Sequence, residues 1–151
     1  MQRHTSLSLL NISHMWSDVL ILNAPKEYEE VLTAFDAEVH KEIKNEFYLF
    51  VQVFGTSNEQ IQTLARKGVE VLGEDGLLWL SYPKKSSKVY KGSDCSRETV
   101  AVLLGDEGYE PVSQVAIDED WSALRFRKAE NIKTMTRKSA VTEKGKQRIG
   151  Q

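Results

Sequence analysis

The sequence is poor in the residues that build disulfides and metal clusters, with one cysteine and three histidines in 151 residues. A single cysteine excludes an internal disulfide and any metal site built from several cysteines. No apolar run approaches the roughly 20 residues that a membrane-spanning helix needs. Residues 1–16 contain one arginine and a broken apolar stretch without a small-residue cleavage site, so we expect no secretory signal. These absences predict a cytoplasmic protein that does not associate with a membrane.

The main part of the chain also lacks excess positive charge. Residues 1–128 hold 14 Lys and Arg against 20 Asp and Glu, a net charge of −6, whereas residues 129–151 hold 6 against 2, a net charge of +4. An acidic body does not suit the phosphate backbone of nucleic acids, so we do not expect nucleic acid as a partner. We predict a single domain over 1–128 and a basic, mobile tail over 129–151, because the tail has little apolar content. A tail that touches nucleic acid is the alternative.

One apolar run organises the predicted fold. Gly76–Tyr82 (GLLWLSY) is bounded by Gly76 and Pro83 and is typical of a strand buried on both faces at the centre of a parallel sheet. Further runs rich in β-branched and aromatic residues, or with alternating polarity, predict the other strands. These strands cover Asp18–Asn23, Ala37–Ile43, Glu46–Phe54, Pro111–Ile117 and Trp121–Arg127. We expect Trp79 and Trp121 in the core, and His40 on the solvent face of an edge strand.

Three helices are predicted between these strands. The first opens at Pro25 and places Tyr28, Val31, Leu32 and Phe35 on one face. The second is capped by Ser57, with Gln60 at the capping-box position, and is expected to end at Gly73. The third covers Ser96–Leu104, and the segment Leu7–Trp16 is expected to pack against the sheet edge.

The order of these elements predicts the fold class. Alternating strands and helices favour a mostly parallel sheet covered on both faces, which is an α/β, three-layer, Rossmann-like sandwich. Only Asp118, Glu119 and Asp120 separate the last two strands. So short a connection requires an antiparallel hairpin at the C-terminal end of the domain.

Three motifs carry a resemblance to a known family: LILNAP (Leu20–Pro25), GLLWLSYPKKSSK (Gly76–Lys88) and DEDWSALRFRK (Asp118–Lys128). They are similar to motifs in a family of small bacterial proteins of unknown function. Members of that family look like shortened, degenerate S-adenosylmethionine-dependent methyltransferase domains. The resemblance implies a methyltransferase-like Rossmann fold over roughly Asp18–Lys128, and it implies a fold rather than an activity.

The sequence departs from true methyltransferases where they hold their cofactor. In those enzymes the first strand ends in a glycine-rich turn, and an acidic residue at the end of the second strand grips the ribose. Here Asn23, Ala24 and Pro25 follow the first strand, no glycine precedes Gly55, and proline removes a backbone donor. Glu42 and Glu46 lie near the second strand's end, but nothing marks either as a ribose ligand. We therefore expect no S-adenosylmethionine cofactor.

A lysine-rich loop follows the predicted central strand. In open α/β sheets, ligands bind at the carboxyl ends of the strands, and ammonium and hydroxyl groups there suit a phosphate or carboxylate. The N-terminus of the next helix would add a favourable dipole. The candidate ligand-binding residues are Asn23, Thr56, Lys84, Lys85, Ser86, Ser87 and Lys88. The alternatives are that the loop is lysine-rich for solubility, that Asn23 only ends a strand and that Thr56 helps to cap a helix.

Catalytic and metal-binding residues are not predicted. Cys95 lies between Lys91 and Arg97, which would favour a reactive thiolate, but no histidine is near in sequence, so we expect an unreactive thiol. No grouping of His, Asp and Glu has metal-ligand spacing. The acids at Asp118–Asp120 fit a solvated hairpin tip.

Three functions stay open. The first is a non-catalytic domain that binds a small anionic or nucleotide-like ligand. The second is an active methyltransferase with an altered cofactor pocket, and the third is an interaction or scaffold protein that uses its tail or an edge strand.

Overall fold

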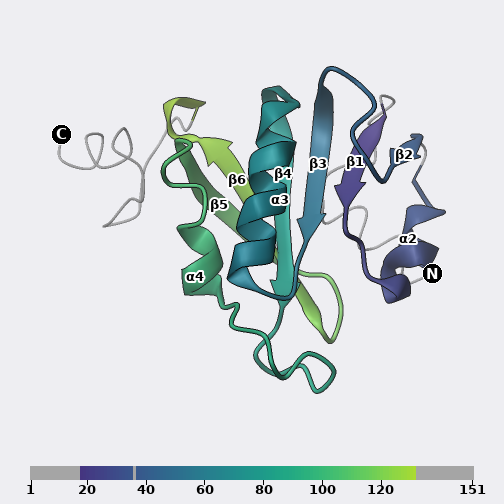
Figure 1. Cartoon of the computed structure of the whole chain (residues 1–151), viewed down its shortest axis with the longest axis vertical. Helices are drawn as coiled ribbons and strands as arrows, with labels where there is room; N and C mark the ends of the chain where they lie inside the picture. Colours follow the sequence, from purple (N-terminus) through teal and green to yellow (C-terminus); the bar gives the residue numbers. More distant parts are fainter. Residues whose placement is uncertain (1–17, 36, 132–151) are drawn as a thin grey trace.

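The computed structural model of the protein describes residues 18–35 and 37–131. Six strands form one sheet in the order β2-β1-β3-β4-β6-β5 (Figure 1). They are β1 (Val19–Leu22), β2 (Val39–His40), β3 (Tyr48–Phe54), β4 (Leu72–Pro83), β5 (Tyr109–Ala116) and β6 (Trp121–Lys128). The first four are parallel, and β6 runs antiparallel to both β4 and β5. The predicted mostly parallel sheet with a C-terminal antiparallel hairpin is confirmed.

Strand β4 lies in the interior of the sheet, between β3 and β6, as predicted. Its side chain Trp79 is only 1% exposed. The strand is longer than expected, because it begins at Leu72, directly after the preceding helix. Gly73 therefore lies in the strand, and the prediction that it ends the helix was wrong. The backbone N–H of Val71 donates to the carbonyl of Gly68 and closes the helix without a glycine stop.

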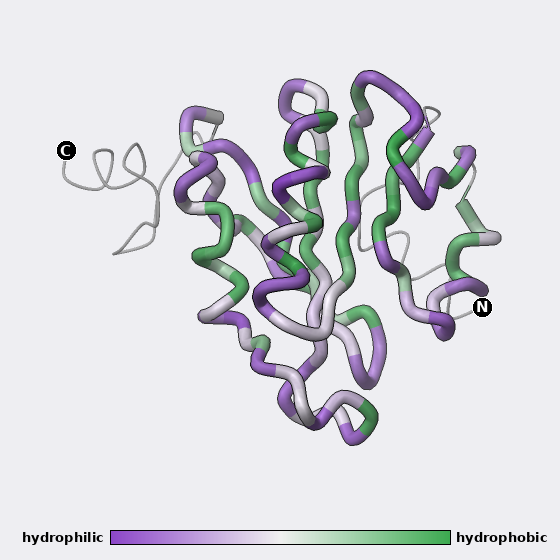
Figure 2. Tube along the Cα trace, viewed as in Figure 1, coloured by the Kyte–Doolittle hydropathy of each residue, from purple (hydrophilic) through white to green (hydrophobic). Residues whose placement is uncertain are grey.

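Helices cover both faces of the sheet, which gives three layers. One face carries the 3-10 helix η1 (Lys26–Tyr28) and α2 (Glu29–Leu32), and the other carries α3 (Asn58–Glu70) and α4 (Arg97–Ala101). A second 3-10 helix, η2 (Ala129–Asn131), follows β6. Successive strand side chains point to opposite faces. Val51 and Val53 consequently pack with the α3 side, whereas Phe50 and Phe54 pack with the α2 side. Figure 2 shows the strands largely hydrophobic and most of the connecting loops hydrophilic.

The first predicted helix is shorter than its sequence periodicity indicates. Only η1 and the single turn α2 form, and neither has a side-chain N-cap hydrogen bond. Helices this short depend on packing rather than on their own propensity. Tyr28 and Leu32 are buried as predicted, and Val31 and Phe35 are partly buried beside them.

The two later helices begin at the predicted caps. The Ser57 hydroxyl oxygen accepts a hydrogen bond from the Gln60 backbone N–H, 3.1 Å away. The Gln60 side chain accepts from the Thr56 backbone instead of completing the expected capping box on Ser57. At α4, Ser96 and Thr99 cap each other reciprocally, and the helix ends at Ala101, before the predicted Leu104.

The edge strand β2 differs most from its prediction. Only two residues pair with β1, and Ile43 is 42% exposed. His40 was predicted on the solvent face, but it is 4% exposed, so that prediction was wrong. The Tyr48 ring packs edge-on against the imidazole, with ring centroids 5.5 Å apart. The cover comes from β3, two strands away, which the local pattern does not reveal.

Some predictions fall beyond the part of the chain that the structure describes. The predicted lead-in Leu7–Trp16 and residues 132–151 of the predicted tail lie outside the described residues. Among the described residues, no helix is long and apolar enough to cross a bilayer.

Gly68 brings α3 close to strand β3, and substitution of this glycine tests the packing. A Cβ added at Gly68 would lie 2.8 Å from Val51 Cγ1, whereas one added at Gly92 would meet nothing within 4 Å. Gly68→Ala gains up to about 1 kcal/mol of helix propensity, but overpacking costs about 1–3 kcal/mol. We expect urea denaturation to show a net loss of about 1 kcal/mol for Gly68→Ala. Gly92→Ala should stay within about 0.5 kcal/mol of the wild type. Equal stabilities for the two variants would contradict this packing.

Candidate functional site

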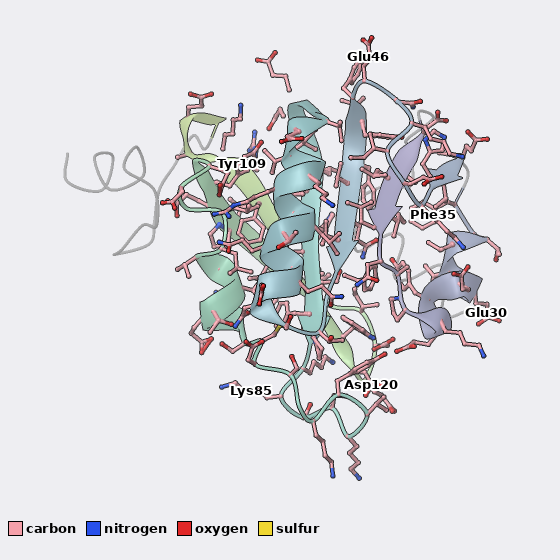
Figure 3. All side chains as sticks on the ribbon, viewed as in Figure 1. Glu30, Phe35, Glu46, Lys85, Tyr109 and Asp120 are labelled. Atoms are coloured by element: carbon pink, nitrogen blue, oxygen red, sulfur yellow. The ribbon has the colours of Figure 1, made fainter. Side chains whose placement is uncertain are left out.

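Three parallel strands end at the same edge of the sheet. The last residues of β1, β3 and β4 are Leu22, Phe54 and Pro83. The predicted ligand-binding residues follow directly, so Asn23, Thr56 and the lysine-rich loop share this carboxyl edge, as the sequence predicted. Figure 3 shows Lys85 and Asp120 at this end of the molecule and Glu46 at the opposite end. Glu46 is therefore far from any ligand bound at the carboxyl edge.

The topological switch point lies between β1 and β3. The connection from β1 to β2 passes over one face of the sheet through η1 and α2, and the connection from β3 to β4 passes over the other through α3. Ligands of open α/β sheets bind in the crevice at such a point. Here the Asn23 side-chain amide donates to the Phe54 carbonyl oxygen across a distance of 2.9 Å, which joins the two strand ends.

Asn23 adopts the backbone conformation that a glycine would favour after β1. Its φ is +62°, in the left-handed region that asparagine tolerates better than most residues. The chain thus turns sharply after β1 without a glycine. The turn is made by Asn23, whose side-chain amide also bonds to the end of β3.

An open groove of about 570 Å³ adjoins the switch point. It is lined by Leu22, Asn23, Lys41, Ser57, Glu59, Gln60, Thr63 and Leu64. Lys41 follows β2, and its ammonium group lies 3.0 and 3.1 Å from the two carboxylate oxygens of Glu29. We did not predict Lys41 or the α3 residues as site residues, although their positions after a strand and in the first turns of a helix were available signals.

The lysine-rich loop, residues 84–96, is fixed to the rest of the protein on both sides of the sheet. The buried Ser87 hydroxyl donates to the Asp120 carboxylate over 2.8 Å and accepts from the backbone N–H groups of Val89 and Tyr90. Farther along, the Asp94 carboxylate accepts from the Asn58 backbone N–H at 2.8 Å, at the start of α3. Ser87 was predicted to face a ligand, but its hydroxyl is used to shape the loop.

The third attachment is a carboxylate shared by two aromatic donors. Glu27 Oε2 accepts from the Tyr90 hydroxyl at 2.5 Å and from the Trp121 indole N–H at 3.0 Å. The Tyr90 and Trp121 rings pack with centroids 4.9 Å apart, and Trp121 packs on Phe54 at 5.2 Å. These contacts join residues 63 and 94 positions apart, and nothing in the local sequence indicated them.

The ionisation of this group follows from its contacts. Burial raises the pKa of Glu27, but the hydrogen bonds from Tyr90 and Trp121 oppose it, and the net pKa is lowered. Burial, together with the negative Glu27, raises the pKa of Tyr90 to about 12. Tyr90 therefore stays a protonated donor at neutral pH. Because folding lowers the Glu27 pKa, the ionised carboxylate stabilises the folded protein at neutral pH. This stabilisation is lost as the pH falls through the lowered pKa of Glu27.

The ammonium groups of the loop are left facing solvent. Lys85, Ser86 and Lys88 are exposed and Lys84 is partly buried. None of the three lysines forms an ion pair with any residue that the structure describes. Thr56 is exposed as well, with its hydroxyl 3.5 Å from Gln60 Oε1. The loop therefore presents unpaired positive charge from a fixed backbone.

The acidic side chains at the hairpin tip form hydrogen bonds within the protein, which fits the expectation that they are not catalytic. The Asp118 carboxylate accepts from the backbone N–H groups of Asp120 and Trp121, each at 2.8 Å. The Asp120 carboxylate accepts a hydrogen bond from the Ser87 hydroxyl. The tip thus supports the loop.

Comparisons with known proteins establish the fold. No protein-family model and no curated protein match the sequence. Among solved structures, the N-methyltransferase NodS from Bradyrhizobium japonicum WM9 matches with a TM-score of 0.55 at 18% identity, over 84% of this chain and 94% of that chain. An S-adenosylmethionine-dependent methyltransferase from Clostridium acetobutylicum ATCC 824 matches with a TM-score of 0.55 at 8% identity, over 84% and 89%. The mitomycin 7-O-methyltransferase MmcR matches with a TM-score of 0.56 at 11% identity, over 84% and 54%.

At these identities the similarity shows the fold alone. The fold is methyltransferase-like and Rossmann-type, which confirms the predicted class. The resemblance to a family of small bacterial proteins stays a prediction.

The carboxyl edge does not fit S-adenosylmethionine, the cofactor that this fold implies. The Asn23 amide already spans the crevice to Phe54, and Pro25 offers no backbone donor. The first residue after β2 is Lys41, which pairs with Glu29, rather than the acidic residue that the resemblance to methyltransferases implies near the ribose. The residues of this edge therefore do not form the usual cofactor site.

Cys95 is a packed thiol beside the loop. It is 3% exposed. Burial raises its pKa, and the neighbouring Asp94 carboxylate raises it further. Both effects keep sulfur in the protonated, poorly nucleophilic form.

This environment predicts that the Cys95 thiol reacts slowly with thiol reagents. In the folded protein at pH 8, we expect Ellman's reagent to react with Cys95 much more slowly than it does after unfolding in guanidinium chloride. Absorbance of the released thiolate measures both rates. Complete reaction of the folded protein within the mixing time would show that the thiol is accessible and ionised.

The Glu27 contacts predict what holds the lysine-rich loop in place. Glu27→Ala leaves the Trp121 N–H and the Tyr90 hydroxyl without their acceptor, at a cost of about 1–2 kcal/mol in the free energy of unfolding. Amide hydrogen exchange of residues 84–94 should accelerate. Glu30→Ala is the matched control, because the exposed Glu30 carboxylate has no hydrogen bond or ion pair with residues 18–35 or 37–131. If both variants exchange at the wild-type rate, Glu27 does not hold the loop.

Proposed function

We propose that the protein is a non-catalytic methyltransferase-like domain that binds a small anionic or nucleotide-like ligand at the carboxyl edge of its sheet. The observation that carries the proposal is the fixed loop with unpaired lysines. Ser87, Tyr90 and Asp94 hold its backbone at three points, while Lys84, Lys85 and Lys88 form no ion pair in the described structure. Grouped ammonium ions on a positioned loop attract phosphate and carboxylate groups.

The neighbouring groove supports a ligand larger than an inorganic ion. Its volume of about 570 Å³ lies in the range of small-molecule sites, roughly 300–1,000 Å³. Leu22 and Leu64 supply apolar surface, and Ser57 and Thr63 supply hydroxyl groups. A nucleotide has this combination of an apolar base, a polar sugar and charged phosphates. Thr56 and Ser86 are exposed hydroxyls at the same edge.

The mismatch with S-adenosylmethionine supports binding without methyl transfer. Asn23 bonds to Phe54 and Lys41 pairs with Glu29 at the strand ends where the resemblance to methyltransferases implies a glycine-rich turn and an acidic residue. An active methyltransferase would need a different mode of cofactor binding. The methyltransferase-like fold is the observation that keeps this second function as the alternative.

Calorimetric titration with ADP, pyrophosphate and S-adenosylmethionine tests the proposal. We expect ADP or pyrophosphate to bind, and the triple variant Lys84→Ala, Lys85→Ala, Lys88→Ala to weaken that binding about tenfold. The estimate assumes about 0.2–1 kcal/mol for each exposed charge contact. Stability should change by no more than about 0.5 kcal/mol per substitution. The matched control replaces Lys44, Lys67 and Lys128, which are exposed and lie outside the loop.

The outcomes separate the functions. Equal weakening by the control triple variant would mean that overall charge, not the loop, attracts the anion. No binding of either anionic probe would overturn the proposal. A stoichiometric heat with S-adenosylmethionine alone would favour the active methyltransferase.

A further inference from the structure

A group of metal-ligating side chains lies at the other end of the first two strands. Val19 pairs with Val39 and Leu20 with His40, which places Asp18 opposite Glu38 at the amino end of the strands. His40 follows Glu38 by two residues and so lies on the same face. Its Nε2 atom is 2.7 Å from Glu38 Oε2 and 3.5 Å from Asp18 Oδ2. The strand register brings the three residues together, which the sequence spacing did not indicate.

Within the described residues, no lysine or arginine balances the two carboxylates of this group. Like charges directly opposite each other on neighbouring strands are destabilising. Among the described residues, neither Asp18 nor Glu38 forms an ion pair with Lys or Arg, and the nearby Lys41 pairs with Glu29. The His40 Nε2 atom lies within 3.5 Å of both carboxylates, and the neutral Asn45 amide also donates to Asp18 Oδ2. A cation at this point would remove the repulsion.

We propose that His40, Glu38 and Asp18 bind a divalent transition-metal ion such as Zn²⁺. Their ligand atoms all lie within 4.8 Å of one another. Ligands about 2.0–2.2 Å from a tetrahedral zinc ion lie roughly 3.3–3.6 Å apart, so the observed 2.7 and 3.5 Å require only small side-chain adjustments. One imidazole nitrogen with two carboxylate oxygens suits zinc and its neighbours better than magnesium or calcium.

The burial of the three side chains gives the ion a route of entry. The His40 side chain is 5% exposed, whereas those of Asp18 and Glu38 are 37% and 73% exposed. The histidine would hold the metal from the protein side, and the carboxylates would close on it from solvent. Remaining coordination positions would face water. The ion can therefore enter without opening the core.

A second set of contacts orients the ligands. The Tyr48 hydroxyl lies 2.5 Å from His40 Nδ1, and its oxygen accepts the backbone N–H groups of Lys44 and Asn45, each at 3.1 Å. Because the Tyr48 oxygen already accepts two N–H groups, its own O–H donates to Nδ1, and Nε2 carries the imidazole proton toward Glu38. Zinc on Nε2 would release that proton to solvent while Tyr48 keeps its hydrogen bond to Nδ1. The Asn45 side chain donates to Asp18 Oδ2 at 3.0 Å. Such outer contacts are typical of protein metal sites.

The ion would join the two-residue strand β2 to β1. Asp18 precedes β1, and the other two ligands lie at and just before β2. The site is at the amino end of these strands, away from the lysine-rich loop at the carboxyl edge. Its existence is therefore independent of the proposed anion site.

Titration of the chelator-treated, untagged full chain with Zn²⁺ tests the proposal. We expect one ion per chain by calorimetry, a higher melting temperature, and zinc-induced shifts of the Val19 and Val39 amide signals in a ¹⁵N–¹H spectrum. Glu38→Gln keeps the shape of an exposed side chain but removes a ligand, and should weaken zinc binding at least about tenfold. Glu42→Gln removes the same charge outside the group and should bind zinc as the wild type does.

Three results would overturn the proposal. These are the absence of zinc binding, equal affinities of Glu38→Gln and Glu42→Gln, and amide shifts confined to other regions. In the first case the group is only a histidine hydrogen-bonded to carboxylates. In the other two, zinc binds elsewhere, for example at His4 or His14, which lie outside the described residues.

Discussion

The structure depends on the way that β4 pairs with its two neighbours. It is parallel to β3 on one side and antiparallel to β6 on the other. Because β6 runs in the opposite direction, it begins where β4 ends, with Trp121 opposite Pro83. The hairpin tip is thereby brought under the lysine-rich loop, where the Lys84 backbone N–H donates to the Asp120 carbonyl oxygen over 2.8 Å. A fully parallel sheet would leave this loop without that support.

At the carboxyl edge, two residues that follow β1 make contacts within the protein. Asn23 and Glu27, which follow β1, bind other parts of the protein: Asn23 binds the end of β3, and Glu27 binds Tyr90 and Trp121. The methyltransferase-like fold is set by the pairing of the six strands and by the two hydrophobic layers, to one of which Tyr28 and Leu32 contribute. A fold of this kind does not fix the ligand that its edge binds.

The described part of the chain also divides its charge along the strands. Unpaired ammonium groups extend from the carboxyl edge, whereas two carboxylates meet at the amino ends of β1 and β2. Each group is placed by a different feature of the sheet: the loop by its three attachments, and the carboxylates by the pairing register. The two ends of the sheet therefore carry side-chain charges of opposite sign.

The sequence by itself determined the strands of the sheet, the hairpin and the edge at which the lysines gather. These features depend on local periodicity, on short connections and on the rule that parallel strands end together. Tertiary structure alone decided the burial of His40, the acceptor shared by Tyr90 and Trp121, and the meeting of Asp18 with Glu38. The physical reason is distance along the chain, because Tyr48 covers His40 from across β1, and Trp121 reaches Glu27 from 94 residues away. Local patterns contain no information about such neighbours.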